Sequence, residues 1–155
     1  MHRRLQSPTL RALLGALLLL PLLLAAGPAL AGPPAARIEV WVIHASRQGD
    51  EVDPRLAPLK RQLKGFSFSA YQLIERRIES VPAGAALEMA LPGERTLKIT
   101  PEGHEEGRRR VRLEIPGLVN TTYLVDQGGT LIVGGPKHQG GNLILAVALR
   151  EAASE

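Results

Sequence analysis

The sequence predicts a mainly β domain: an antiparallel β-sandwich or open barrel of seven to eight strands, with one short helix at about residues 54–64. Two observations predict this class. Beyond residue 37, short stretches recur in which apolar, often β-branched residues alternate with polar ones, as half-buried strands require. Proline- and glycine-containing turn sequences separate these stretches, and no internal repeat is evident.

The first 31 residues have the three-part layout of a secretory signal peptide. Three arginines precede the leucine- and alanine-rich run Leu13–Ala26, and Ala29-Leu30-Ala31 places small residues where a signal peptidase cuts. The apolar run is shorter than the ~20 residues that span a bilayer and contains Pro21, which disfavours an uncleaved anchor. We expect cleavage after export by the general secretory route. The product is then periplasmic or secreted and has no transmembrane segment.

The domain boundaries follow from this cleavage. Residues 32–36 are expected to form a flexible lead-in, residues 37–150 a single β-rich domain, and residues 151–155 a frayed tail. The net charge of +4 falls to +1 because three arginines leave with the signal peptide, so binding to nucleic acid is not expected. The chain has no cysteine, which excludes disulfides, thiolate metal sites, cysteine nucleophiles and lipid attachment at a cysteine.

The first predicted elements are a strand and the helix. Alternation from Arg37 predicts the strand, followed by a polar loop from Ser46 to Asp53. Asp53-Pro54 resembles a helix start, with a capping side chain before a proline at the first helical position. Pro58 removes a helical hydrogen bond, so either the first turn is irregular or the regular helix runs only from about Pro58 to Lys64.

Strands and turns account for the rest of the domain. Residues 66–81 are expected to be extended, and four apolar side chains there are available for burial: Phe68, Ala70, Ile74 and Ile78. Further strands are predicted at residues 87–91, 97–99, 111–115, 119–125, 130–133 and 142–149. Pro101 to Gly107 is expected to be a polar link, and Gly134 to Gly141 a glycine-rich one.

The last predicted strand is apolar on both faces from Leu143 to Leu149. A strand with one face in water alternates, so both faces of this strand must be covered. The favoured interpretation is a central strand whose second face is covered by the helix leucines, Leu56, Leu59 and Leu63. The alternative is that a partner protein covers it.

No segment carries a recognisable catalytic or metal-binding motif. There is no His-Glu-x-x-His pair, no Gly-x-Ser-x-Gly turn and no phosphate-binding loop, so no metal or other cofactor is expected. The basic cluster Arg108–Arg112 follows Glu102, Glu105 and Glu106, which predicts local neutralisation across a hairpin. If the protein is an enzyme, the first candidate catalytic residues are His44, Asp126, Lys137 and His138. If it binds a ligand, the candidates are Trp41, Tyr71, Lys137 and His138.

Several short motifs resemble a group of uncharacterised small secreted proteins of Gram-negative bacteria, notably deltaproteobacteria. They are Val52-Asp53-Pro54, Phe68-Ser69-Ala70-Tyr71, Leu91-Pro92-Gly93, Asn120-Thr121-Thr122 and the run from Gly128 to Pro136. The resemblance implies an envelope location and a β fold, without an activity. Gly128 to Gly135 is also similar to a hairpin of the outer-membrane secretins.

These observations favour an exported, non-enzymatic β-sandwich module that acts through protein–protein contacts in the cell envelope. Two alternatives stay open: a small periplasmic hydrolase or lyase whose site is assembled from distant residues, and a module that binds a polysaccharide or small ligand. The second alternative requires an exposed groove lined by Trp41 or Tyr71. The sequence does not give the partner, the strand order or the oligomeric state.

Overall fold

The computed structural model describes residues 36–82 and 84–151. The predicted signal peptide lies outside the described residues, as do residues 32–35 of the predicted lead-in and residues 152–155 of the predicted tail. Ala36 and Glu151 were expected in the lead-in and the tail, but they are the first residue of strand β1 and the last residue of strand β8. The two residues lie opposite each other in the sheet, so this pairing extends the domain by one residue at each end.

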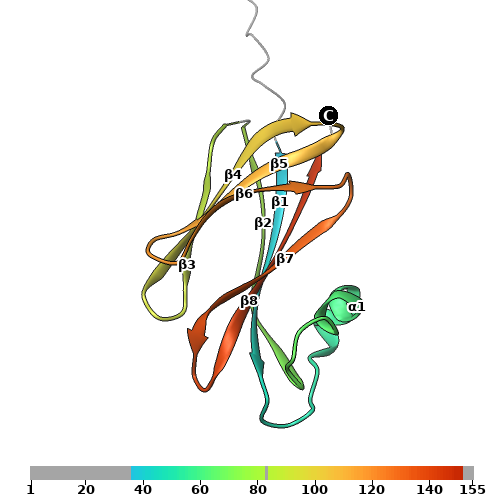
Figure 1. The fold of residues 1–155 in the computed structure, drawn as a ribbon, viewed down its shortest axis with the longest axis vertical. Coiled ribbons are helices and arrows are strands. Elements are labelled where there is room, and N and C mark those ends of the chain that lie inside the picture. Colours follow the sequence, from blue (N-terminus) through green and yellow to red (C-terminus); the bar gives the residue numbers. More distant parts are fainter. Residues whose placement is uncertain (1–35, 83, 152–155) are drawn as a thin grey trace, which may run out of the picture. The chain divides into compact units, whose positions relative to one another are not determined.

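The described chain forms two open antiparallel sheets of four strands each, which confirms the predicted mainly β class (Figure 1). Sheet A has the order β2-β1-β8-β7, and sheet B has the order β3-β4-β5-β6. The strands are β1 Ala36–Ser46, β2 Ala70–Val81, β3 Leu87–Leu91, β4 Arg95–Glu105, β5 Arg108–Ile115, β6 Val119–Val125, β7 Thr130–His138 and β8 Gly141–Glu151. The edges of the two sheets are therefore β2 and β7 in sheet A, and β3 and β6 in sheet B.

The main core lies between the two sheets. It is built mainly from aliphatic side chains that alternate inward along the strands. Its fully buried members from the central strands include Ile38, Ile99, Leu113 and Leu145.

A second apolar cluster covers the opposite face of sheet A. The short helical segment supplies Leu56, Leu59 and Leu63, which pack with Ile144, Ala146 and Ala148 of β8 and with neighbouring apolar side chains of β1 and β2. The other face of β8, from Leu143 to Leu149, packs into the core between the sheets. The interpretation that the helix covers the second face of the last strand is thus confirmed, and no partner protein is needed to explain that strand.

The helix resolves the problem that Pro58 poses. Residues Pro54–Leu59 (η1) form a 3₁₀ helix and residues Lys60–Leu63 (α1) form one α-helical turn. Asp53 caps the segment as predicted, with its side chain accepting a hydrogen bond from the Arg55 backbone N–H. The proline-containing part is therefore the irregular one, which was one of the two alternatives.

Two predicted links are wrong. β4 continues through the polar segment to Glu105 with a bulge beyond Pro101, and only a tight turn at Glu106-Gly107 joins it to β5. β7 likewise continues to His138 with a bulge beyond Gly134, and the turn is at Gln139-Gly140. In both turns each of the two residues has a positive φ, which is the geometry of a two-residue hairpin.

The burial expected for residues 66–81 is also largely wrong. Tyr71 and Leu73 are the buried residues in the first half of β2, whereas Ile74 and Ile78 are 42% and 44% exposed. The pairing with β1 shifts by one residue between Val42 and Ile43, which leaves Ile74 as the extra residue of a β-bulge. A bulge reverses the alternation beyond it, so a single period-2 pattern fails for this strand.

Candidate functional site

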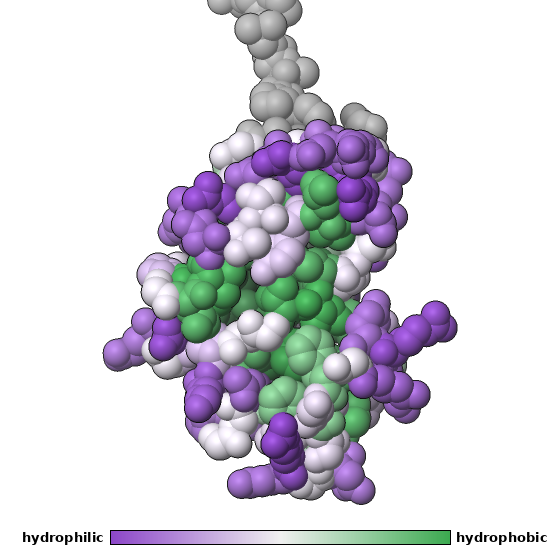
Figure 2. All heavy atoms as spheres, viewed as in Figure 1, coloured by the Kyte–Doolittle hydropathy of each residue, from purple (hydrophilic) through white to green (hydrophobic). Residues whose placement is uncertain are grey.

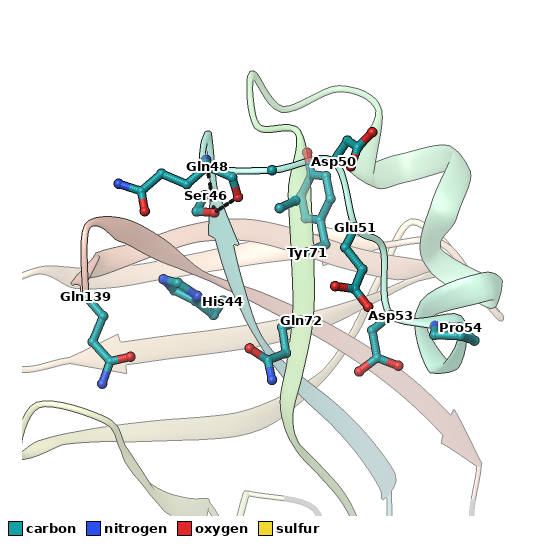
Figure 3. A pocket seen from close by; sticks show the side chains of 12 residues that line it. His44, Ser46, Gln48, Asp50, Glu51, Asp53, Pro54, Tyr71, Gln72 and Gln139 are labelled. Carbon is teal, nitrogen blue, oxygen red and sulfur yellow. Dashed lines mark hydrogen bonds between the residues drawn. The ribbon is translucent and has the colours of Figure 1, made fainter.

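A polar cleft lies at one end of sheet A, where β1 ends and β2 begins. Its volume is about 630 Å³, and its lining comes from the end of β1, the loop that follows it, the start of β2 and the β7–β8 turn. Figure 3 shows His44, Gln72 and Gln139 projecting from these elements on the same side, with Glu51 and Asp53 beside Gln72. This cleft is where the candidate residue His44 lies.

Local hydrogen bonds fix the loop that forms one wall of the cleft. Tyr71 donates its backbone N–H to the Glu51 carbonyl at 2.9 Å, and its carbonyl accepts from the Asp53 N–H at 2.8 Å. Val52 therefore forms a parallel bridge with Tyr71, and the loop lies along the start of β2. The Ser69 hydroxyl donates to the Gly49 carbonyl at 2.6 Å and holds the tip of the loop.

Asp53 is the electrostatic anchor of this wall. Its carboxylate accepts from the backbone N–H and guanidinium of Arg55, and also from the backbone N–H of Leu73 at 3.2 Å. These bonds, those from Arg55 foremost, hold the pKa of Asp53 well below its usual value near 3.8. Since Asp53 is already bound by Arg55, its carboxylate is not free to act as a catalytic base.

His44 and His138 lie together although 94 residues separate them in sequence. The His44 Nε2–H donates to the backbone carbonyl of His138 at 3.0 Å, and the two rings meet edge to face with centroids 5.6 Å apart. Ser46, the nearest hydroxyl along β1, donates to the Gln48 carbonyl at 3.3 Å. Within the described part of the chain, His44 and Ser46 therefore each bond to a backbone carbonyl. They form no nucleophile–base pair with each other.

The other two candidate catalytic residues do not complete a site with His44. Lys137 is exposed and, by alternation along β7, faces away from His138. Asp126 lies in the β6–β7 turn, near the opposite end of β7 from His138. Thr130 and His138 are eight residue steps apart along β7, so Asp126 is on the order of 25 Å from the cleft. The proposed set of four therefore does not converge.

The two aromatic candidates for ligand binding are buried. Trp41 is 5% exposed and packs in the helix-side cluster, with the Arg76 guanidinium 5.5 Å from its ring centre. Tyr71 is 7% exposed, and its hydroxyl donates to the Leu63 carbonyl at 2.9 Å. Burial raises the pKa of Tyr71. Neither ring faces solvent as a stacking platform, which an aromatic sugar-binding groove requires.

The cleft offers many groups that can donate or accept hydrogen bonds. Glutamine and carboxylate side chains dominate its lining, and no group of three or more potential metal ligands occurs among residues 36–82 and 84–151. No helix in the described part of the chain is long and apolar enough to cross a membrane.

A second surface lies where the edge strands β6 and β7 leave the core incompletely covered. Four apolar side chains from this edge pack against the core but stay partly exposed: Val119, Tyr123, Leu131 and Val133. Thr121 is paired with the buried Leu113 and so points to the inner side of sheet B, yet it is exposed. Figure 2 shows apolar side chains in a band across this face, in the region where Figure 1 places β6 and β7. We call the set Val119, Thr121, Tyr123, Leu131 and Val133 the β6 mouth.

The sequence alone does not single out the β6 edge. Its signal is present in the chain, because Val119-Asn120-Thr121-Thr122-Tyr123-Leu124-Val125 is the only one of the eight described strands without a charged residue. That signal has meaning only once the strand is known to lie at an edge, and strand order comes from the fold.

Comparisons with protein-family models, with curated proteins and with solved structures found no match. The function is therefore inferred from the residues of this chain.

Proposed function

We propose that this protein is an exported β-sandwich module, periplasmic or secreted, that acts through protein–protein contacts in the cell envelope. The proposed contact surface is the free edge of β6 together with the β6 mouth. An extended segment of a partner would pair with β6 as an additional strand of sheet B and place alternate side chains over the mouth.

The observation that carries the proposal is that β6 lacks the features that protect the other edges. An exposed strand edge with unpaired backbone groups invites pairing, and proteins block it with charges, prolines, bulges or short strands. β2 carries four charged residues between Glu75 and Glu79, and β7 has a bulge that contains Pro136. β3 has only five residues and carries Glu88. β6 has seven residues, with neither a charge nor a proline.

The β6 mouth supports the same surface. Edge-strand pairing supplies affinity through backbone hydrogen bonds, whereas specificity comes from pockets for alternate side chains. Here the exposed, inward-facing Thr121 lies between Val119 and Tyr123, which pack against the core. The side chains of a partner strand would therefore contact an apolar surface. Export is supported by the signal-peptide pattern of residues 1–31.

A lysine at Thr121 tests the proposal. Thr121 is exposed, so Thr121→Lys leaves the fold intact while it places a charge over the mouth. Tagged wild-type protein, incubated with envelope extract and recovered, should retain a stoichiometric companion. Thr121→Lys should retain about tenfold less of it, which corresponds to a loss of ~1.4 kcal/mol of binding free energy.

Ala90→Lys provides the matched control. Ala90 is exposed on β3, the other edge of the same sheet, so this variant should retain the companion as the wild type does. Thermal melts establish that both variants are folded. Equal retention by wild type and Thr121→Lys, or a wild-type protein that neither retains a companion nor associates with itself, contradicts the proposed contact surface.

A further inference from the structure

We infer that a second copy of this chain occupies the β6 edge, paired antiparallel with the first across a twofold axis at Thr122. This inference rests on the proposed function and names the partner. The pairing of the two β6 strands joins the two copies of sheet B into one continuous sheet of eight strands, four from each copy.

The sequence of β6 is self-complementary in this register. When Thr122 lies opposite Thr122 of the second copy, Val119 lies opposite Val125, Thr121 opposite Tyr123 and Asn120 opposite Leu124. Opposed residues of an antiparallel pair share a face of the sheet. Threonine pairs and pairs of aromatic with β-branched residues are favourable across strands, and Thr122–Thr122 and Thr121–Tyr123 belong to these two classes.

The register also matches the inner faces of the two copies. The inward-facing residues of β6 are those paired with the buried side of β5: Val119, Thr121, Tyr123 and Val125. The twofold axis pairs members of this set only with each other. In each copy the partly exposed Leu131 and Val133 of β7 pack against the core between the sheets. They can therefore cover the inner face of the two paired β6 strands.

The charge distribution permits this self-pairing. β6 contributes no charged residue, so the twofold axis brings no like charges into opposition within the strand pair. The charged groups next to β6 are held within their own copy. Arg109, opposite Val125, is paired with Glu151. Glu102 accepts from the Thr122 hydroxyl and is paired with Arg110. Arg112 donates to the Asn120 side chain at 2.8 Å and Arg110 is paired with Glu105. By contrast, pairing β2 with itself would bring together strands that both carry Arg76 and Arg77.

The size of the contact sets its strength. A seven-residue strand is roughly 23 Å long, and pairing along one edge buries less surface than a standard interface. The dimer is therefore expected to dissociate on dilution, and its detection requires measurement over a range of concentrations.

Single cysteines test the register directly because the natural chain has none. In the proposed dimer the Cα atoms of the two Thr122 residues are about 4.5–5.5 Å apart, within the range that a disulfide spans. Under mild oxidation, Thr122→Cys should give at least tenfold more covalent dimer than Leu124→Cys. Leu124 is exposed on the same face of β6, but its own copy lies about 13 Å away along the strand.

A mixed sample sharpens the test. Asn120→Cys and Leu124→Cys should each crosslink poorly alone, yet crosslink with each other when mixed, because the register places these two positions opposite each other. Crosslinking of Thr122→Cys no better than Leu124→Cys, or mixed crosslinking no better than either variant alone, overturns the inference.

The failure of this inference is distinguishable from the failure of the proposed function. If the cysteine variants show no preferred register while wild type, but not Thr121→Lys, retains a different envelope protein, the β6 edge binds a foreign strand and the second copy is excluded. If Thr121→Lys changes neither the sedimentation of the protein nor its companions, the contact surface itself is wrong.

Discussion

Asp53 joins two parts of the chain that are distant in sequence. It caps the helical segment through Arg55 and accepts from the Leu73 backbone N–H, which fixes the loop wall of the cleft against β2. The side chain is only 11% exposed, and the Arg55 guanidinium beside it is 65% exposed. Its carboxylate is therefore a structural acceptor, and its ionisation is tied to the folded state.

This coupling gives the fold an acid sensitivity. The pKa of Asp53 is lower in the folded protein than in the unfolded chain, so its contribution to stability is present above about pH 4 and is lost as the pH falls further. In Asp53→Asn the free energy of unfolding should be lower at pH 7 and should decline less steeply between about pH 5 and pH 2. Denaturant titrations at several pH values measure this, with Asp50→Asn at an exposed loop position as the control. Parallel pH profiles for Asp53→Asn and wild type would contradict the assignment.

At the residue scale, sequence reasoning identifies local contacts and misses distant ones. The Asp53 cap follows from the Asp-Pro pair and is confirmed. The contact of Asp53 with Leu73 spans 20 residues, and that of His44 with His138 spans 94, so neither has a local signature. For the same reason the distance of Asp126 from the cleft was not predictable.

At the scale of elements, the β7–β8 hairpin shows how closely sheet A is packed at the cleft. Gly141 begins β8, and a Cβ atom there would overlap the Ala45 carbonyl oxygen of β1 and lie 2.9 Å from His44 Nε2. Glycine is required at this point because the β1 backbone approaches it too closely for a side chain.

Gly141→Ala should therefore separate the end of β1 from β8 and lower the free energy of unfolding by about 3 kcal/mol. Gly134→Ala, on the neighbouring strand β7, is the matched control. A Cβ atom at Gly134 has open space around it, so this variant should change the free energy of unfolding by no more than about 0.5 kcal/mol. Denaturant unfolding of the two variants measures the difference. Equal stability would show that the strands separate without cost.

Strands with a regular alternation are predictable, and strands interrupted by bulges are not. The alternation of β5 gives its buried face correctly, with Val111, Leu113 and Ile115 inward. β4 and β7 continue beyond their bulges through polar or glycine-rich sequence, which has the composition of a loop. The bulge in β2 moves its buried residues to the alternate positions. A bulge is defined by the partner strand, so its position is not visible in one strand alone.

At the scale of the whole molecule, the fold explains why β8 is apolar on both faces and shows that β6 is an edge strand. The two apolar faces of β8 are covered by the helical leucines and by sheet B, which accounts for the last strand within the chain itself. The surface left for contact is instead β6, which becomes notable only because the topology places an uncharged strand at an edge. The fold class was predictable from composition and periodicity, whereas this surface depends on strand order.

We propose that the free edge of β6 engages another protein chain. Amide hydrogen exchange, measured on dilute protein and on protein at a concentration where it associates, tests this proposal. We expect the outward-facing amides of Val119–Val125 to exchange at least tenfold more slowly in the associated state, while exchange at the β3 edge, Leu87–Leu91, is unchanged. Unchanged exchange in β6, with protection appearing on another surface, would contradict it.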